Sequence, residues 1–237
     1  RPYVDLTAAV MHDFGVTTGH DSDQLLSVPG RQRYHAREYT IEPDASSASY
    51  FFAAAAMTGG HMRVEGLGRE SAQGDYRFLE VLERMGCRVE RGSAATDVWG
   101  PERLLGVAED MHDISDMAQT LAVLAPFAEG STTIENIANT RLKETDRIAA
   151  VATELRRLGQ HVDESPDGLR ITPAPITPAT IETYDDHRMA MAFALIGLRV
   201  PGIRLLDPGC VGKTFPDFFA RLEELCTSGG APIVWNG

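Results

Sequence analysis

The segment RLKETDR could do chemistry because it places Arg141, Lys143 and Arg147 at the start of a predicted amphipathic helix. The dipole and the free N–H groups at a helix start favour anions, so cations there are unfavourable unless a negative group joins them. Glu144 and Asp146 could be that group, which would make the segment a solvated surface of ion pairs. A bound anion is the other possibility, and the cations would then form an anion-binding site.

The composition excludes several classes of function. The chain has 237 residues and a formal net charge of −12, which argues against non-specific binding to nucleic acid or to an anionic membrane. An anionic ligand would therefore need a local basic cluster. The three cysteines are far apart and form no CxxC pair, so we expect neither a zinc site nor disulfides, and a reducing compartment fits. With no membrane-spanning apolar run and no visible signal peptide, we expect a cytoplasmic protein.

A repeat of about 70 residues organises the chain. Asp44, Asp116 and Asp186 are separated by 72 and 70 residues, and each opens a segment rich in Ala or Met (DASSASYFFAAAA, DMAQTLAVLAPFA, DHRMAMAFALIGL). These segments predict buried helices, each followed by a β-rich run. The glycines expected to end the helices are Gly60, Gly130 and Gly202.

A second set of aspartates has the same period. Asp75, Asp146 and Asp217 are separated by 71 residues each, and each lies in the first turn of a predicted amphipathic helix. We expect Asp75 and Asp217 to be helix caps only. Residues 1–20 match the second half of an earlier unit and begin inside a predicted helix without an initiator Met, so we interpret the chain as a fragment cut upstream.

These patterns predict an α/β (α+β) fold in which three βαβαβ-type units pack around buried helices. The repeat would align helix N-termini at one end of the lobe, where they favour phosphate and carboxylate groups. The loops before the amphipathic helices are SAQG, RLKET and CVGKTF. Cations occur in two of the three loops, whereas a purely structural requirement would have repeated them.

The chain resembles the 5-enolpyruvylshikimate-3-phosphate synthase family. The resemblance extends from about Tyr3 to about Leu225, and its motifs are YTIEPDASSASYFFAAAA, NTRLKETDRI, ETYDDHRMAMAFAL and LLDPGCVGKTFPDFF. It implies two lobes of three such units each, closing around the substrates. Residues 1–42 would be the tail of the N-terminal lobe, and residues 43–237 would form the C-terminal lobe.

The resemblance also implies the reaction. The family transfers the enolpyruvyl group of phosphoenolpyruvate to the 5-hydroxyl of shikimate 3-phosphate through a tetrahedral intermediate, without a metal or organic cofactor. Two anionic substrates and two proton transfers require fixed cations with interleaved carboxylates. The cations of RLKETDR would be part of that site.

Site residues follow from the matched motifs. The residues that resemble the phosphoenolpyruvate-binding group are Arg147 and Arg188 at its carboxylate and Lys213 at its phosphate. The residues that resemble the shikimate 3-phosphate-binding group are Tyr3, Asp116, Asn139 and Lys143. The residues that resemble the catalytic acids and bases are Asp116, at the 5-hydroxyl, and Glu144, at the enol methylene.

Some of these residues, and their neighbours, could instead have purely structural roles. Arg188 could form an exposed surface ion pair. Asp186 is expected to cap its helix and to orient Arg188, and His187 is expected to be a packed neighbour. Cys210 is near Lys213, but nothing in the sequence activates it as a nucleophile.

The resemblance lacks the motifs of the family's N-terminal lobe. We therefore expect the chain alone to be an incomplete, inactive catalyst that needs that lobe, and otherwise a monomer without nucleic-acid or membrane partners. One alternative is a UDP-N-acetylglucosamine enolpyruvyl transferase, which the motifs KETDR, DDHRMA and KTFPDFF disfavour. The others are a non-catalytic module that binds phosphorylated ligands and one half of a two-chain enzyme.

Overall fold

The computed structural model describes residues 2–22 and 25–228. Its α-helices are α1 (Pro2–Asp13), α2 (Ala45–Thr58), α3 (Phe78–Arg84), α4 (Ala118–Leu124), α5 (Arg147–Arg157), α6 (His187–Ile196) and α7 (Phe218–Ser228). The 3₁₀ helices are Gly74–Arg77, His112–Met117, Ala125–Phe127, Ala138–Leu142 and Pro208–Lys213. Within these ranges no helix is both long and apolar enough to cross a membrane.

The strands form several small sheets. They are β1 (Gly19–Ser22), β2 (Leu25–Ser27), β3 (His61–Glu65), β4 (Arg88–Arg91), β5 (Ala95–Trp99), β6 (Leu104–Leu105), β7 (Ala108–Asp110), β8 (Ala128–Glu129), β9 (Thr132–Glu135), β10 (His161–Ser165), β11 (Gly168–Thr172), β12 (Thr180–Ile181) and β13 (Arg204–Leu205). The sheet orders are β3-β5-β4 and β10-β11-β9-β7, with the pairs β1-β2, β6-β8 and β12-β13. Antiparallel and parallel pairs both occur, so the predicted α/β class is confirmed.

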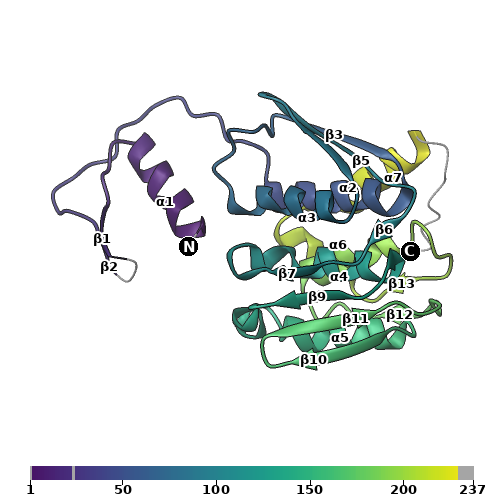
Figure 1. Ribbon diagram of the computed structural model, residues 1–237. Helices are drawn as coiled ribbons and strands as arrows, with labels where there is room; N and C mark the ends of the chain where they lie inside the picture. The colour runs from purple at the N-terminus through teal and green to yellow at the C-terminus, as the bar shows by residue number, and fades with distance from the viewer. Residues whose placement is uncertain (1, 23–24, 229–237) are drawn as a thin grey trace.

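Helices α2, α4 and α6 form the centre of the molecule and pack against one another (Figure 1). Every residue of α4 is buried, and so are most residues of α2 and α6. These helices lack a continuous polar face, and a helix that is apolar all round is stable only inside a core. The prediction of buried helices is confirmed, whereas the equivalence of three repeated units stays a prediction.

Two of the predicted aspartate caps open their helices as expected. The Asp44 carboxylate accepts from the backbone amides of Ser46 and Ser47, and Asp186 accepts from the amide of Arg188 at 2.8 Å. Asp116 differs, because it lies inside the 3₁₀ helix that precedes α4 and makes no capping bond. Its carboxylate instead faces cations, which are stronger partners than a neutral backbone amide.

Asp146 caps α5 by accepting from the amide of Ala149 at 3.0 Å. The capping role expected for Asp75 is wrong. Asp75 is buried and accepts hydrogen bonds from the hydroxyls of Tyr3 at 2.9 Å and Ser46 at 2.5 Å. Burial favours the neutral form and raises the pKa of Asp75, so the two hydroxyl donors provide the polar contacts that a buried carboxyl requires.

The helix ends also differ from the prediction. A left-handed residue, Gly59, ends α2 next to the expected Gly60, but α4 and α6 end well before Gly130 and Gly202. After α4, Pro126 in the 3₁₀ helix Ala125–Phe127 lacks the N–H that would continue the α-helix. Gly130 and Gly202 instead have positive φ values of 90° and 94° in the turns before the next strands.

The predicted helix at the start of the chain is confirmed as α1, but none of its residues is buried. In Figure 1 it stands apart from the central helices, at the left, and a loop connects it to the β1-β2 hairpin. Apolar side chains are also exposed in β2 and in the segment that follows the hairpin, among them Leu25, Tyr34 and Ile41. Residues 2–22 and 25–42 thus present apolar surface that no described part of the chain covers.

Candidate active site

Charged residues from several chain segments meet at the beginnings of α4, α5 and α6. We call them the charged cluster, and they are Asp116, Lys143, Glu144, Arg147, Arg188 and Lys213. The amphipathic pattern of α5 buries one face and brings Arg147 inward. The predicted convergence of the four cations is confirmed, in a chain whose net charge is −12.

Asp116 joins three of the cations. Its carboxylate accepts from Lys143 Nζ at 3.0 Å and Arg188 Nη2 at 2.9 Å, and Arg147 Nη1 lies 3.3 Å away. Burial alone would raise the pKa of Asp116, but the Arg188 and Lys143 charges lower it below its ordinary value. Asp116 is therefore ionised at neutral pH and ties the three helix starts together.

Glu144 joins two of the cations. Its carboxylate accepts from Lys213 Nζ at 2.5 Å and Arg147 Nη2 at 2.8 Å. Burial alone would raise the pKa of Glu144, but the hydrogen bond from Lys213 and the Arg147 charge lower it to about 2. A group with this pKa accepts protons poorly at neutral pH, so catalysis by Glu144 would require Lys213 to move to another anion.

Arg147 is fixed by a buried ion pair. Its Nε lies 2.7 Å from Asp186 Oδ2, and the two side chains are 3% and 0% exposed. The expectation that Asp186 orients Arg188 is wrong, because its carboxylate holds the guanidinium of Arg147 and contacts Arg188 through the backbone amide. Arg147 lies at the start of α5 and pairs with Asp186, whereas the Arg188 side chain pairs with Asp116 in the 3₁₀ helix before α4.

Arg188 is not an exposed surface pair, since its side chain is 13% exposed and contacts the partly buried Asp116. Tyr3 and Asn139 lie at the border of the cluster. Asn139 Nδ2 donates to Ser115 Oγ at 3.0 Å, and Lys143 Nζ is 6.0 Å from the centre of the Tyr3 ring. The structure thus places every predicted site residue in or beside one cluster.

His187 is buried next to the cluster. Its Nδ1 lies 4.0 Å from Glu144 Oε1 and 3.9 Å from Asp186 Oδ1, and within the described part of the chain it has no hydrogen-bond partner. Burial lowers the pKa of His187, so it is a neutral packed neighbour, as expected. Among the described residues no group of three or more His, Cys, Asp or Glu side chains could hold a metal ion.

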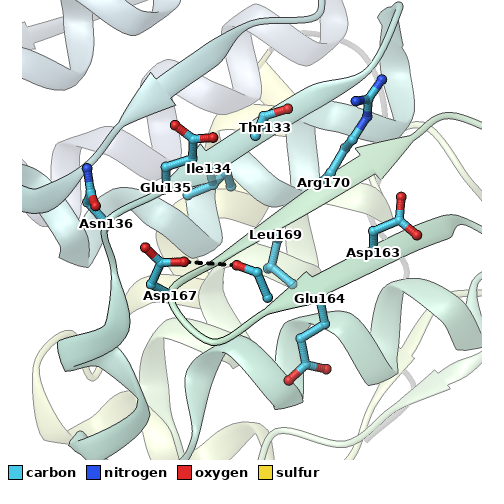
Figure 2. A pocket seen from close by; sticks show the side chains of 10 residues that line it. Thr133, Ile134, Glu135, Asn136, Asp163, Glu164, Asp167, Leu169 and Arg170 are labelled. Atoms are coloured by element: carbon cyan, nitrogen blue, oxygen red, sulfur yellow. Dashed lines mark hydrogen bonds between the residues drawn. The ribbon is translucent and has the colours of Figure 1, made fainter.

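A cavity of about 390 Å³ lies away from the charged cluster. It is a hollow over β9, β10 and β11 (Figure 2), and its charged lining residues are Glu135, Asp163, Glu164, Asp167 and Arg170. Carboxylates dominate this lining, so the cavity does not suit an anionic substrate.

Acid should destabilise the chain partly through Glu144. Its pKa is about 2 in the folded chain against an ordinary 4.5, so its contribution is complete above about pH 4.5 and is lost as the pH falls toward about 2. The side chain is 23% exposed, which reduces the effect, and we expect wild type to lose about 1–2 kcal/mol more than Glu144→Gln. Urea titrations at about pH 5 and pH 2.5 measure this difference, and equal losses would contradict it.

Comparison with known proteins identifies the family of this chain. The family model described as EPSP synthase (3-phosphoshikimate 1-carboxyvinyltransferase) matches residues 1–222. The chain belongs to the EPSP synthase family. The matched range includes every member of the charged cluster.

Several curated members of the EPSP synthase family are more than half identical to this chain. A 3-phosphoshikimate 1-carboxyvinyltransferase of Nostoc punctiforme is 56% identical over 94% of the chain and 52% of that protein. One from a Nostoc sp. is 57% identical over 95% of the chain and 53% of that protein. The chain therefore spans about half the length of the curated relatives it matches.

A solved structure gives the same result for the fold. EPSP synthase from Acinetobacter baumannii has a TM-score of 0.79 and 27% identity, covering 96% of this chain and 55% of that one. The mixed α/β architecture described above is therefore that of EPSP synthase structures.

Proposed function

We propose that the chain supplies the phosphoenolpyruvate-binding and proton-transfer groups of a 3-phosphoshikimate 1-carboxyvinyltransferase. In this reaction the 5-hydroxyl oxygen of shikimate 3-phosphate bonds to C2 of phosphoenolpyruvate, and the methylene carbon of phosphoenolpyruvate gains a proton. The tetrahedral intermediate then loses phosphate and that carbon returns a proton, which leaves the enolpyruvyl ether. The convergence of four cations on two carboxylates at three helix starts supports this proposal.

Arg147, Arg188 and Lys213 would bind phosphoenolpyruvate. The buried pair with Asp186 holds Arg147 in place, so its guanidinium is preorganised for a carboxylate. Lys213 is 58% exposed and contacts Glu144, and it can turn toward an incoming phosphate at little cost. That movement would remove a cation from Glu144 and raise its pKa, which lets Glu144 exchange a proton with the enol methylene.

Shikimate 3-phosphate would bind on the Asp116 side of the cluster. Lys143 would turn to the oxygen atoms of this substrate, which removes a cation from Asp116 and lets its carboxylate accept the 5-hydroxyl proton. Asn139 and Tyr3 lie beside these two residues, where they complete the contacts with this substrate. The site needs no metal or organic cofactor, because its cations supply the electrostatic stabilisation.

We also propose the domain arrangement that the sequence predicts. Residues 43–237 form a lobe of three repeated units, and residues 1–42 belong to the tail of an N-terminal lobe that closes the site in a cytoplasmic monomer. The exposed apolar side chains of residues 25–41 and the greater length of the relatives support this arrangement.

The test joins this chain to the N-terminal portion of the Nostoc sp. relative, and we call the product the joined enzyme. We expect phosphate release from phosphoenolpyruvate and shikimate 3-phosphate by the joined enzyme and no measurable turnover by the chain alone. Efficient turnover by the chain alone would contradict the need for a second lobe.

Two controls separate the alternatives. Offering UDP-N-acetylglucosamine as acceptor tests the other enolpyruvyl transferase, and we expect no product with it. If the joined enzyme binds shikimate 3-phosphate without turning it over, the chain is a phospho-ligand-binding module and the proposed activity is wrong.

A further inference from the structure

A strained turn lies just before the segment that carries Asp186 and Arg188. Tyr184 and Asp185 have φ values of 56° and 54°, in the left-handed region that residues with a Cβ rarely adopt. Two such residues in succession persist only where surrounding contacts hold them. The proposed mechanism leaves unexplained what holds this turn.

A backbone hydrogen bond from the Asp186 amide to the Thr183 carbonyl, 2.9 Å long, closes the turn. A carboxylate on α5 adds a buried side-chain contact that holds it. The Glu154 side chain is 0% exposed and accepts from the Tyr184 hydroxyl at 2.8 Å and the Glu182 amide at 3.2 Å. Its other partner is Arg157, whose Nε is 3.0 Å away. Burial and the bond to Glu154 raise the pKa of Tyr184 to about 12, so the phenol remains a hydrogen-bond donor at neutral pH.

Glu154 and Arg147 act on the same segment from one face of α5. They are seven residues apart, which is about two helical turns. Arg147 pairs with Asp186 on the far side of the strained turn, while Glu154 holds Tyr184 on the near side. Helix α5 therefore contacts both sides of the turn, with the cation Arg147 on one side and the anion Glu154 on the other.

We propose that Glu154 is a positioning residue for the anion site. By holding Tyr184 it keeps the turn in its left-handed conformation, and this directs Asp186 to Arg147 and Arg188 to Asp116. If the hydrogen bond is removed, the turn can relax toward ordinary φ values and the start of α6 shifts. The inference rests on the proposed function only for the identity of the ligand, phosphoenolpyruvate.

The first test needs no activity and uses the 237-residue chain. In ¹⁵N-labelled protein the Nε–H of Arg147, bonded to Asp186 at 2.7 Å, gives a signal that reports the turn. We expect Tyr184→Phe to shift this signal and to speed its exchange with water by roughly five- to tenfold, as for the loss of one hydrogen bond. Glu154→Gln is a second variant that tests the same contact from the other side.

Two control variants separate positioning from general stability. Tyr76→Phe removes another buried phenol hydrogen bond, the one to Thr96 Oγ1 at 2.7 Å, in a part of the molecule that does not hold the turn. Arg157→Gln removes the partner of Glu154 that does not contact the turn. We expect neither variant to move the Arg147 signal, and an unchanged signal in both Tyr184→Phe and Glu154→Gln would overturn the proposal.

The second test is kinetic and uses the joined enzyme. We expect Tyr184→Phe to raise KM for phosphoenolpyruvate by roughly five- to tenfold and to leave KM for shikimate 3-phosphate within about twofold. Tyr76→Phe should change neither constant, and equal behaviour of the two variants would reduce Glu154 to a structural role. If wild-type joined enzyme has no activity, the proposed function fails, while the Arg147 signal still decides whether Glu154 positions the turn.

Discussion

Glu144→Gln in the joined enzyme is expected to lower kcat by about 10²–10⁴-fold with little change in KM, the range for loss of a general acid–base group. Glutamine keeps the size of the side chain, and its one amide oxygen can still accept from Lys213 or from Arg147, but it cannot exchange a proton. Phosphate release at saturating concentrations of both substrates measures the effect.

Glu83→Gln is the matched control for this experiment. Glu83 also pairs with an arginine, Arg91, through two bonds of 2.8 Å, and its pKa is also lowered, chiefly by those bonds. It lies outside the charged cluster, so its loss should leave kcat unchanged. A kcat near wild type for Glu144→Gln would mean that Glu144 only balances the charges of Lys213 and Arg147.

Arg188→Ala is expected to have the opposite kind of effect. Loss of a charge-assisted pair worth about 1.5–3 kcal/mol should raise KM for phosphoenolpyruvate by about 10- to 150-fold. Shikimate 3-phosphate binding should be nearly intact, because Asp116 keeps its contacts with Lys143 and Arg147. Initial rates with each substrate varied in turn separate the two constants.

Two further variants sharpen this prediction. Arg188→Lys keeps the charge but loses the bidentate geometry, so its KM for phosphoenolpyruvate should lie between those of wild type and Arg188→Ala. Arg84→Ala breaks a bidentate ion pair with Glu109 outside the cluster and should leave both constants unchanged. An equal rise in both KM values for Arg188→Ala would show that Arg188 organises the whole cluster rather than the phosphoenolpyruvate side.

Much of the architecture could be predicted because it depends on neighbouring residues. The helices α2, α4 and α6 follow from apolar runs without a polar face, and Asp44 and Asp186 cap helices through amides two or three residues away. The helix ends were harder to predict because a glycine pattern marks a turn without deciding which turn ends the helix. Pro126 had already ended α4 before Gly130.

The site could be predicted as a set of residues but not as a set of contacts. Cations at the start of α5, where the helix dipole disfavours them, indicated an anion site, and the family motifs then supplied Arg188 and Lys213. The same sequence did not reveal Glu154, although its place seven residues after Arg147 on one face of α5 was a usable signal.

The sequence by itself determined which helices are buried and which cations are available for anions. Only the tertiary structure decided how those charges pair. Asp116 meets partners 27, 31 and 72 positions away, and Asp186 pairs with Arg147 rather than with the adjacent Arg188 side chain. Local patterns cannot specify such pairs, because the partner of a buried charge depends on which helix starts the core brings together.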